Sequence, residues 1–327
     1  MAVAREDAGL SRLARNTVRN TVTTRLNLDP ERVRGLLSAA RRFRPERHVA
    51  FLCAGRQIGW LRPDAAQRLL AWPDVFRRGT AGVHVADSLT GAAARTAAIN
   101  RVVEALHAQR AVTGWRNERY AVAAAFDAPP LFHIERAAAR FFGTMTYAAH
   151  VNGHCGSGDE CQMWVARRAA SKPIEPGLLD NMVAGGLSAG NAPLDAIVRE
   201  AWEEAGIPAE LARRAIPVGT IDILREVPEG VQWETIFMHD LDLATDFQPV
   251  NQDGEVAEFR RLPVAAVIAT LNEAGRFTLD ASLVALGFLA RRGYLDDETI
   301  RSQIGEATAG EVPPVDRTVA AQSNDSE

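Results

Sequence analysis

Three glutamates lie close together in the sequence, at a spacing that could bind a metal ion. On a helix, Glu200 would lie next to both Glu203 and Glu204, because residues three and four positions apart are neighbours on a helix surface. Carboxylates this close repel one another unless a cation lies between them, and hard divalent ions such as Mg²⁺ prefer oxygen ligands of this kind. The spacing therefore indicates a metal site, whereas the ordinary alternative for an acidic run on a helix is a solvated face.

The segment around these glutamates has the features of an amphipathic helix. Pro193 stands where the first turn of a helix tolerates proline, and Gly206, with Pro208 close behind, supplies an end. The apolar residues fall on one side at helical spacing: Leu194, Ile197, Val198, Ala201 and Ala205. We therefore expect a helix from about Ala192 to Ala205 that buries this side.

Two glycines, Gly185 and Gly186, stand in the loop before that helix. Glycine lets a tight loop approach a site closely, and the amino terminus of a helix can face an anion. A metal held by carboxylates beside such a loop suits a diphosphate, because the ion can neutralise the phosphates, orient them and activate an attacking water. Both glycines are therefore candidates for substrate binding.

The spacing of the whole segment resembles the Nudix box. In that motif a glycine is followed after five residues by a glutamate, and after seven more by Arg-Glu-aliphatic-any-Glu-Glu-any-Gly-aliphatic. The glycine is Gly185 here, and the second block begins at Arg199 and ends at Ile207. One position departs from the motif, because Asn191 stands where the first glutamate is expected.

The resemblance implies roles for individual residues. Glu200 and Glu204 would hold Mg²⁺, with Mn²⁺ as a possible substitute, and Glu203 would share the metal or act as the base. The carbonyl of Ala184 would complete the coordination. Arg199 would orient the carboxylates through ion pairing.

Charged residues outside the box are further candidates. Of Glu255 and Glu258, Glu258 aligns better with the place where many Nudix enzymes carry another glutamate for the metal or the base; the alternative is a strand residue facing solvent. Arg167, Arg168 and Lys172 follow a predicted strand that faces the box loop. They could bind the diphosphate, although exposed surface charge is the ordinary alternative.

Other strings extend the resemblance over most of residues 29 to 295. They are similar to one Nudix subgroup, in which an amino-terminal domain of unknown function precedes the Nudix domain. Its plant and fungal members are hydrolases of the thiamine diphosphate type, which remove phosphate from oxidised or damaged thiamine diphosphate. The strings are GWRNERYAV, PPLFHIERAA and AAHVNGH upstream of the box, DNMVAGGL running into it, and MWVARRAASKP and NQDGEVAEFRRLPV on either side.

The rest of the chain must position the box, and its patterns predict an α/β (α+β) protein. Strands before and after the box helix, with further helices at the end, are typical of an α/β/α sandwich. We expect four regions. They are a flexible arm over residues 1–28, a smaller mixed α/β domain of unknown function over 29–140, the Nudix domain over 141–295, and a disordered tail over 305–327.

Composition and charge exclude several classes of protein. Because 47% of the 327 residues are hydrophobic, the chain can bury a sizeable core and is neither mainly disordered nor fibrous. A net charge of −4 gives no basic excess for binding nucleic acid, and no apolar run is long enough to predict a membrane span. Three cysteines and the lack of a secretory signal favour a cytoplasmic location. His154, Cys155 and Cys161 are too incomplete a group for a zinc site.

We therefore predict a Mg²⁺-dependent hydrolase of a small molecule in which a diphosphate is linked to an organic moiety. Thiamine diphosphate or its oxidised or damaged derivatives are the leading substrates, with Glu203 or Glu258 taking a proton from the attacking water. The amino-terminal domain would cover the site and select the organic half. One alternative is a nucleoside diphosphate derivative or sugar nucleotide as substrate, and another is a module that binds without turnover. By analogy with hydrolases of this fold, a homodimer is one expectation.

Overall fold

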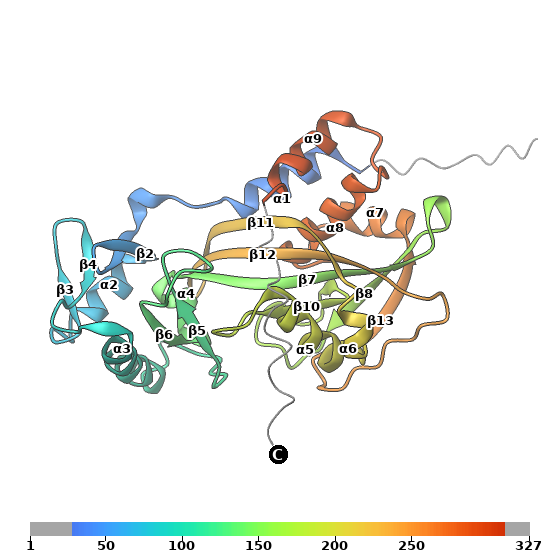
Figure 1. Cartoon of the computed structure of the whole chain (residues 1–327). Coiled ribbons are helices and arrows are strands. Elements are labelled where there is room, and N and C mark those ends of the chain that lie inside the picture. Colours follow the sequence, from blue (N-terminus) through green and yellow to red (C-terminus); the bar gives the residue numbers. More distant parts are fainter. Residues whose placement is uncertain (1–27, 311–327) are drawn as a thin grey trace, which may run out of the picture.

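The computed structural model describes residues 28 to 310, which form two packed units (Figure 1). The predicted arm lies almost entirely outside the described residues, as does most of the predicted tail. The described end of the chain differs from the prediction, because a helix, α9 (Glu298–Ala307), continues past residue 305. Beyond it, the carbonyl of Gly310 accepts a hydrogen bond of 3.0 Å from the N–H of Thr220. Ile300 and Ile304 are buried, and this burial stabilises a segment whose composition alone predicts disorder.

The amino-terminal unit is a small α/β unit around a cluster of aromatic rings. Phe51 is fully buried, and its ring centroid lies 5.4 Å from that of Phe142 and 6.0 Å from that of Phe76. A four-stranded sheet has the order β2-β1-β4-β3, and a separate hairpin joins β5 to β6. The strands are β1 (Val49–Cys53), β2 (Arg56–Leu61), β3 (Phe76–Arg78), β4 (Gly82–Val85), β5 (Arg119–Val122) and β6 (Phe132–Glu135), and the helices are α2 (Pro63–Leu69), α3 (Gly91–Ala108) and α4 (Ala139–Phe142).

The carboxy-terminal unit is built on a seven-stranded mixed sheet. Its main path is β11-β12-β7-β8-β13, with β10 paired to β7 and β9 paired to β8; β7 and β12 run parallel. Strands β7 and β8 form a hairpin around the polar loop at residues 156–161. The strands are β7 (Met145–Cys155), β8 (Gln162–Arg168), β9 (Leu179–Asn181), β10 (Val183–Gly186), β11 (Ile216–Val227), β12 (Gly230–Asp242) and β13 (Val256–Pro263).

Helices cover both faces of this sheet, which confirms the predicted α/β/α sandwich (Figure 1). On one face lie α5 (Pro193–Ala205) and the short α6 (Ala209–Ala212), packed on a core that includes Ile197, Ala201 and Phe237. On the other face lie α7 (Val264–Asn272), α8 (Leu279–Arg291) and α9. The periodicity of α5 explains its place, because its apolar side is the side that contacts the sheet.

The first described helix, α1 (Pro30–Ala40), packs with the carboxy-terminal unit and not with the residues that follow it. Its buried Val33, Leu36 and Ala40 belong to the same apolar cluster as α8 and α9, and Figure 1 shows α1 beside α9. This differs from the expected domain boundary at residue 29. An amphipathic pattern predicts which side of a helix is buried, but it does not identify the surface that buries it.

The two units meet through a tight backbone junction. The N–H of Trp60 donates to the carbonyl of Gly143 at 3.2 Å, and Gly143 has a φ of 56°, a conformation that favours glycine. A β-carbon on Gly230 would lie 2.0 Å from the carbonyl oxygen of Arg140. Strand β12 of one unit therefore lies directly against α4 of the other, and this contact fixes the wall of the site described next.

Candidate active site

The predicted helix is confirmed as α5, and Glu204 is its deepest carboxylate. This residue is only 5% exposed, and its Oε2 accepts a hydrogen bond of 2.9 Å from the N–H of Ala184 on β10. Burial and then the charge of Glu200 raise the pKa of Glu204 well above its usual range. A neutralising partner from outside the protein would relieve this penalty.

Glu200 lies beside Glu204 and carries the ion pair that was expected from the sequence. Nη2 of Arg199 donates to its Oε1 at 2.7 Å. Burial raises the pKa of Glu200 to about 7; Arg199 acts against this shift, and the charge of Glu203 adds to it. The side chain of Glu203 forms no hydrogen bond or ion pair with the described residues, and its carbonyl accepts from the N–H of Gln252 at 2.9 Å.

These carboxylates fit a hard divalent ion by their chemistry. Within residues 28 to 310, no three His, Cys, Asp or Glu side chains are gathered closely enough to hold a metal ion. The structure instead supplies the buried Glu204 and the partly buried Glu200, whose oxygens suit Mg²⁺. A β-carbon on Gly185 would lie 2.2 Å from Cδ of Glu200, so only glycine lets β10 come this close. Ala184 contacts the pair through its N–H, whereas its carbonyl was the expected ligand.

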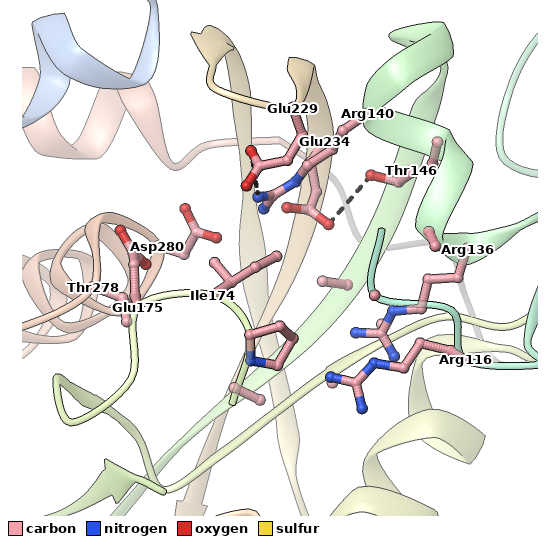
Figure 2. A pocket seen from close by; sticks show the side chains of 18 of the residues that line it. Arg116, Arg136, Arg140, Thr146, Ile174, Glu175, Glu229, Glu234, Thr278 and Asp280 are labelled. Atoms are coloured by element: carbon pink, nitrogen blue, oxygen red, sulfur yellow. Dashed lines mark hydrogen bonds and ion pairs between the residues drawn. The ribbon is translucent and has the colours of Figure 1, made fainter. Parts of the chain in front are cut away.

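A cavity of about 230 Å³ opens beside the end of β10, and both units line it. Gly185 and Gly186, expected in a loop, are the last residues of β10, and the box loop is defined as residues 187 to 192. The predicted Gly185 and Gly186 form part of its wall. Figure 2 shows the guanidinium groups of Arg116 and Arg136 on one side and the carboxylates of Glu175 and Asp280 on the other. The cavity therefore has a cationic side from the amino-terminal unit and an anionic side from the carboxy-terminal unit.

The anionic side has hydrogen-bonding capacity that the described residues leave unused. Oδ1 of Asp280 is buried without a hydrogen-bond partner, while its Oδ2 accepts from Nε2 of Gln232 at 3.2 Å. The same Gln232 donates to Glu234, which also accepts from Oγ1 of Thr146 at 3.2 Å. Burial and then Asp280 raise the pKa of Glu175. A cationic or N–H-bearing ligand would satisfy this side of the cavity.

The structure places Glu258 in an ion-pair network on β13, the edge strand of the sheet. It forms ion pairs of 2.5 Å with Arg167 and Arg260, and these hydrogen bonds hold its pKa below the usual range. Neither Glu258 nor Arg167 lines the cavity, and neither do Glu200, Glu203 and Glu204, which lie behind Gly185 of its wall. Glu255 lies closer to the cavity, because its carboxylate pairs with Arg116 at 3.4 Å.

The other predicted basic residues are occupied by neighbours. Arg168 lines the cavity, but its guanidinium pairs with Asp180 at 2.7 Å and donates to the carbonyl of Ile174. Lys172 pairs with Glu255, and its charge acts to lower the pKa of Glu204. Arg168 and Lys172 thus pair with carboxylates of their own unit. The less engaged cations, Arg116 and Arg136, belong to the amino-terminal unit.

Sequence reasoning did not identify the cationic side. Arg116 and Tyr120 belong to the string GWRNERYAV, and Arg136 belongs to PPLFHIERAA, both of which carry the resemblance to the subgroup. These two strings were the sequence feature from which the cationic side could have been identified. Nothing in the chain order predicts that they lie against Gly186, which is fixed by the docking of the two units.

Known proteins match both units. A model of a domain of unknown function (DUF4743) matches residues 33–146, and a model of the NUDIX domain matches residues 153–281. Nudix hydrolase 24, chloroplastic, of Arabidopsis thaliana is 37% identical over 253 residues, covering 77% of this chain and 69% of that protein. Nudix hydrolase 20, chloroplastic, of the same plant is 40% identical over 205 residues, covering 63% of this chain and 55% of that protein.

A yeast relative, uncharacterized protein YJR142W of Saccharomyces cerevisiae, is 32% identical over 201 residues, covering 57% of this chain and 58% of that protein. The expected order, with a domain of unknown function before a Nudix domain, is confirmed. Among residues 28 to 310, no helix is long and apolar enough to cross a membrane. A chain that shares this much sequence with a Nudix hydrolase, and folds its box around the buried carboxylate of Glu204, belongs to the Nudix hydrolase family.

Proposed function

We propose that this Nudix hydrolase cleaves a diphosphate linked to an organic moiety and depends on Mg²⁺, for which Mn²⁺ can substitute. Thiamine diphosphate or its oxidised or damaged derivatives are the proposed substrates. One observation carries the proposal: the cavity beside the end of β10 has a cationic side and, opposite it, an anionic side (Figure 2). A ligand that is anionic at one end and cationic or N–H-bearing at the other matches both.

The box residues would hold the metal and shape the phosphate end of the site. Glu200 and Glu204 would be the ligands, and a bound Mg²⁺ supplies charge neutralisation and an activated water. Arg199 holds Glu200 through its 2.7 Å ion pair. Gly185 keeps space beside the Glu200 carboxylate, and the hydrogen bond from Ala184 fixes Glu204.

The anionic side supports a positively charged heterocycle. Thiamine diphosphate carries a thiazolium cation and an aminopyrimidine, which provide positive charge and N–H donors. Asp280 has a buried oxygen without a partner, and Glu175 lies on the same side of the cavity. An unpaired buried acceptor is costly, so binding a donor there would be favourable.

Phosphate release from a panel of substrates tests the proposal. The panel contains thiamine diphosphate, oxo- and oxythiamine diphosphate, ADP-ribose, nucleotide sugars and nucleoside triphosphates, each with Mg²⁺ or with EDTA. We expect metal-dependent turnover of the thiamine compounds, and we expect Glu204→Gln to lower it by about 10²–10³-fold. Turnover of nucleotides alone would replace the proposed substrate. Binding without turnover of any compound would favour a non-catalytic module.

A further inference from the structure

We propose that residues at the base of the β5–β6 hairpin, just before β5 and just after β6, complete the active site. In this proposal Arg136 and Arg116 bind the phosphate oxygens of the substrate, and Glu118 is a positioning residue that holds Arg136 against the box loop. The inference rests on the proposed function only in requiring a substrate with a diphosphate. It assigns a role to the domain of unknown function.

The hairpin is joined to the box loop by hydrogen bonds. The N–H of Ala189 donates to the carbonyl of Arg119 at 2.9 Å, and Oγ of Ser188 donates to Oε1 of Glu118 at 2.6 Å. One of these bonds joins backbone to backbone, so it fixes the approach of β5 whatever the side chains do. The box loop therefore has its position set from both units.

At the centre of this contact, Tyr120 and Arg136 lie directly over Gly186. A β-carbon on Gly186 would lie 1.8 Å from Oη of Tyr120 and 3.5 Å from Cζ of Arg136. The guanidinium lies over the Tyr120 ring, 5.7 Å from its centroid. A phosphate at this glycine would thus meet a cation from the other unit.

Both arginines keep donors available for a ligand. Arg136 uses Nη1 for its 2.7 Å bond to Glu118, and its Nε and Nη2 have no partner among the described residues. Arg116 has one longer side-chain contact, 3.4 Å from its Nη1 to Glu255. Figure 2 shows both guanidinium groups pointing into the cavity. The planar arginine fork matches the geometry of phosphate oxygens and can bind two of them at once.

Glu118 connects the cation to the loop. Its carboxylate accepts from both Arg136 and Ser188. Two side-chain bonds to one carboxylate orient Arg136 before substrate arrives, which lowers the entropic cost of binding. The role differs from the expectation that the amino-terminal domain selects the organic half, because its charges face the phosphate half.

The test measures binding of inorganic diphosphate to the full-length chain in Mg²⁺ by titration calorimetry. Loss of a charge-assisted hydrogen bond weakens binding by roughly tenfold to hundredfold, so we expect this for Arg136→Gln and for Arg116→Gln. Arg136→Lys should recover part of the affinity. The control is Arg101→Gln, an arginine of the same unit whose exposed ion pair with Asp74 lies away from the cavity.

Two further readouts separate binding from folding. Each variant is checked by thermal denaturation, and the affinity is measured at several salt concentrations. Removal of a phosphate-binding cation should make the affinity less sensitive to salt, which a purely structural role would not do. Wild-type affinity in both glutamine variants, or no binding of diphosphate by the wild type, would overturn the proposal.

The outcomes for this proposal and for the proposed substrate are distinct. If diphosphate binding depends on both arginines but no thiamine compound is hydrolysed, the substrate assignment fails and the hairpin proposal stands. If thiamine diphosphate is hydrolysed with an unchanged KM in Arg136→Gln and Arg116→Gln, the hairpin proposal fails and the substrate assignment stands. Full-length protein is required, because deleting the amino-terminal unit together with α1 would uncover the carboxy-terminal core.

Discussion

The two units that meet at the cavity place charge there in different ways. On α5, Glu204 is buried and Glu200 is partly buried, and the pKa values of both are raised although Arg199 pairs with Glu200 and Lys172 acts on Glu204. On the hairpin, Arg136 has a carboxylate partner and still presents donors to the cavity. The α5 carboxylates require an added cation to become neutral. The Arg136 guanidinium, in contrast, is already paired with a carboxylate and oriented by it. In the two proposals, the metal would bind to the carboxy-terminal unit and the phosphates would bind to cations of the amino-terminal unit.

The largest expected effect tests the carboxylates of α5. We expect Glu204→Gln to lower kcat by about 10²–10³-fold, the cost of removing one charge-stabilising group from an active site. Steady-state hydrolysis in Mg²⁺ measures it. The substituted amide can keep the 2.9 Å hydrogen bond from Ala184, so the fold is retained. Activity within a few fold of wild type would remove Glu204 from the metal site.

The second largest expected effect tests the close contact between Gly186 of the carboxy-terminal unit and Tyr120 of the amino-terminal unit. Gly186→Ala places a methyl group against Oη of Tyr120, and we expect it to destabilise the protein by about 1–3 kcal/mol through overpacking and to lower activity. Chemical denaturation measures the change. The matched control is Gly35→Ala in α1, where a β-carbon meets no atom within 4 Å. Equal changes in stability for the two substitutions would contradict the close contact between Tyr120 and Gly186.

A smaller effect appears as a pH dependence of stability in EDTA. The pKa of Glu204 is raised in the folded state, so the folded protein binds more protons than the unfolded chain as the pH passes above the usual glutamate pKa. Stability from this group is therefore present at low pH and lost as the pH rises. We expect the melting temperature of Glu204→Gln to gain on the wild type between about pH 5 and pH 8. A constant difference would contradict the burial argument.

The smallest effect concerns the two glutamates near β13. Glu258→Gln removes exposed ion pairs, so we expect kcat/KM to change by about twofold or less. Glu255→Gln frees Lys172 and Arg116, and its effect should be larger because Arg116 lines the cavity. The reverse order would restore Glu258 as the catalytic candidate.

Much of the box could be predicted because its information is local. Helical spacing alone places Glu200 beside Glu204, and Gly206 ends α5 with a φ of 63°. The choice between Glu255 and Glu258 was not local, since the pairing of β13 with β8 shifts between Val256 and Glu258. An irregularity of this kind changes which side chains face the site, and alternation along a strand does not reveal it.

The contact between the two units also depends on information that is not local in the sequence. The apolar stripe of α1 predicts burial, yet the helix packs on α8 and α9 from the far end of the chain. The position of Arg136 over Gly186 likewise depends on how the two sheets dock. The fold class and the adjacent carboxylates of α5 follow from periodicity and spacing, whereas the cationic side of the cavity follows from tertiary structure.

The packing of α1 has a consequence for biosynthesis. This helix leaves the ribosome before every other described element, but the helices that cover its Val33 and Leu36 are among the last to be made. During translation its apolar side therefore stays exposed, available to a chaperone, while the amino-terminal unit can already fold. When α8 and α9 appear, they close a loop that contains that entire unit.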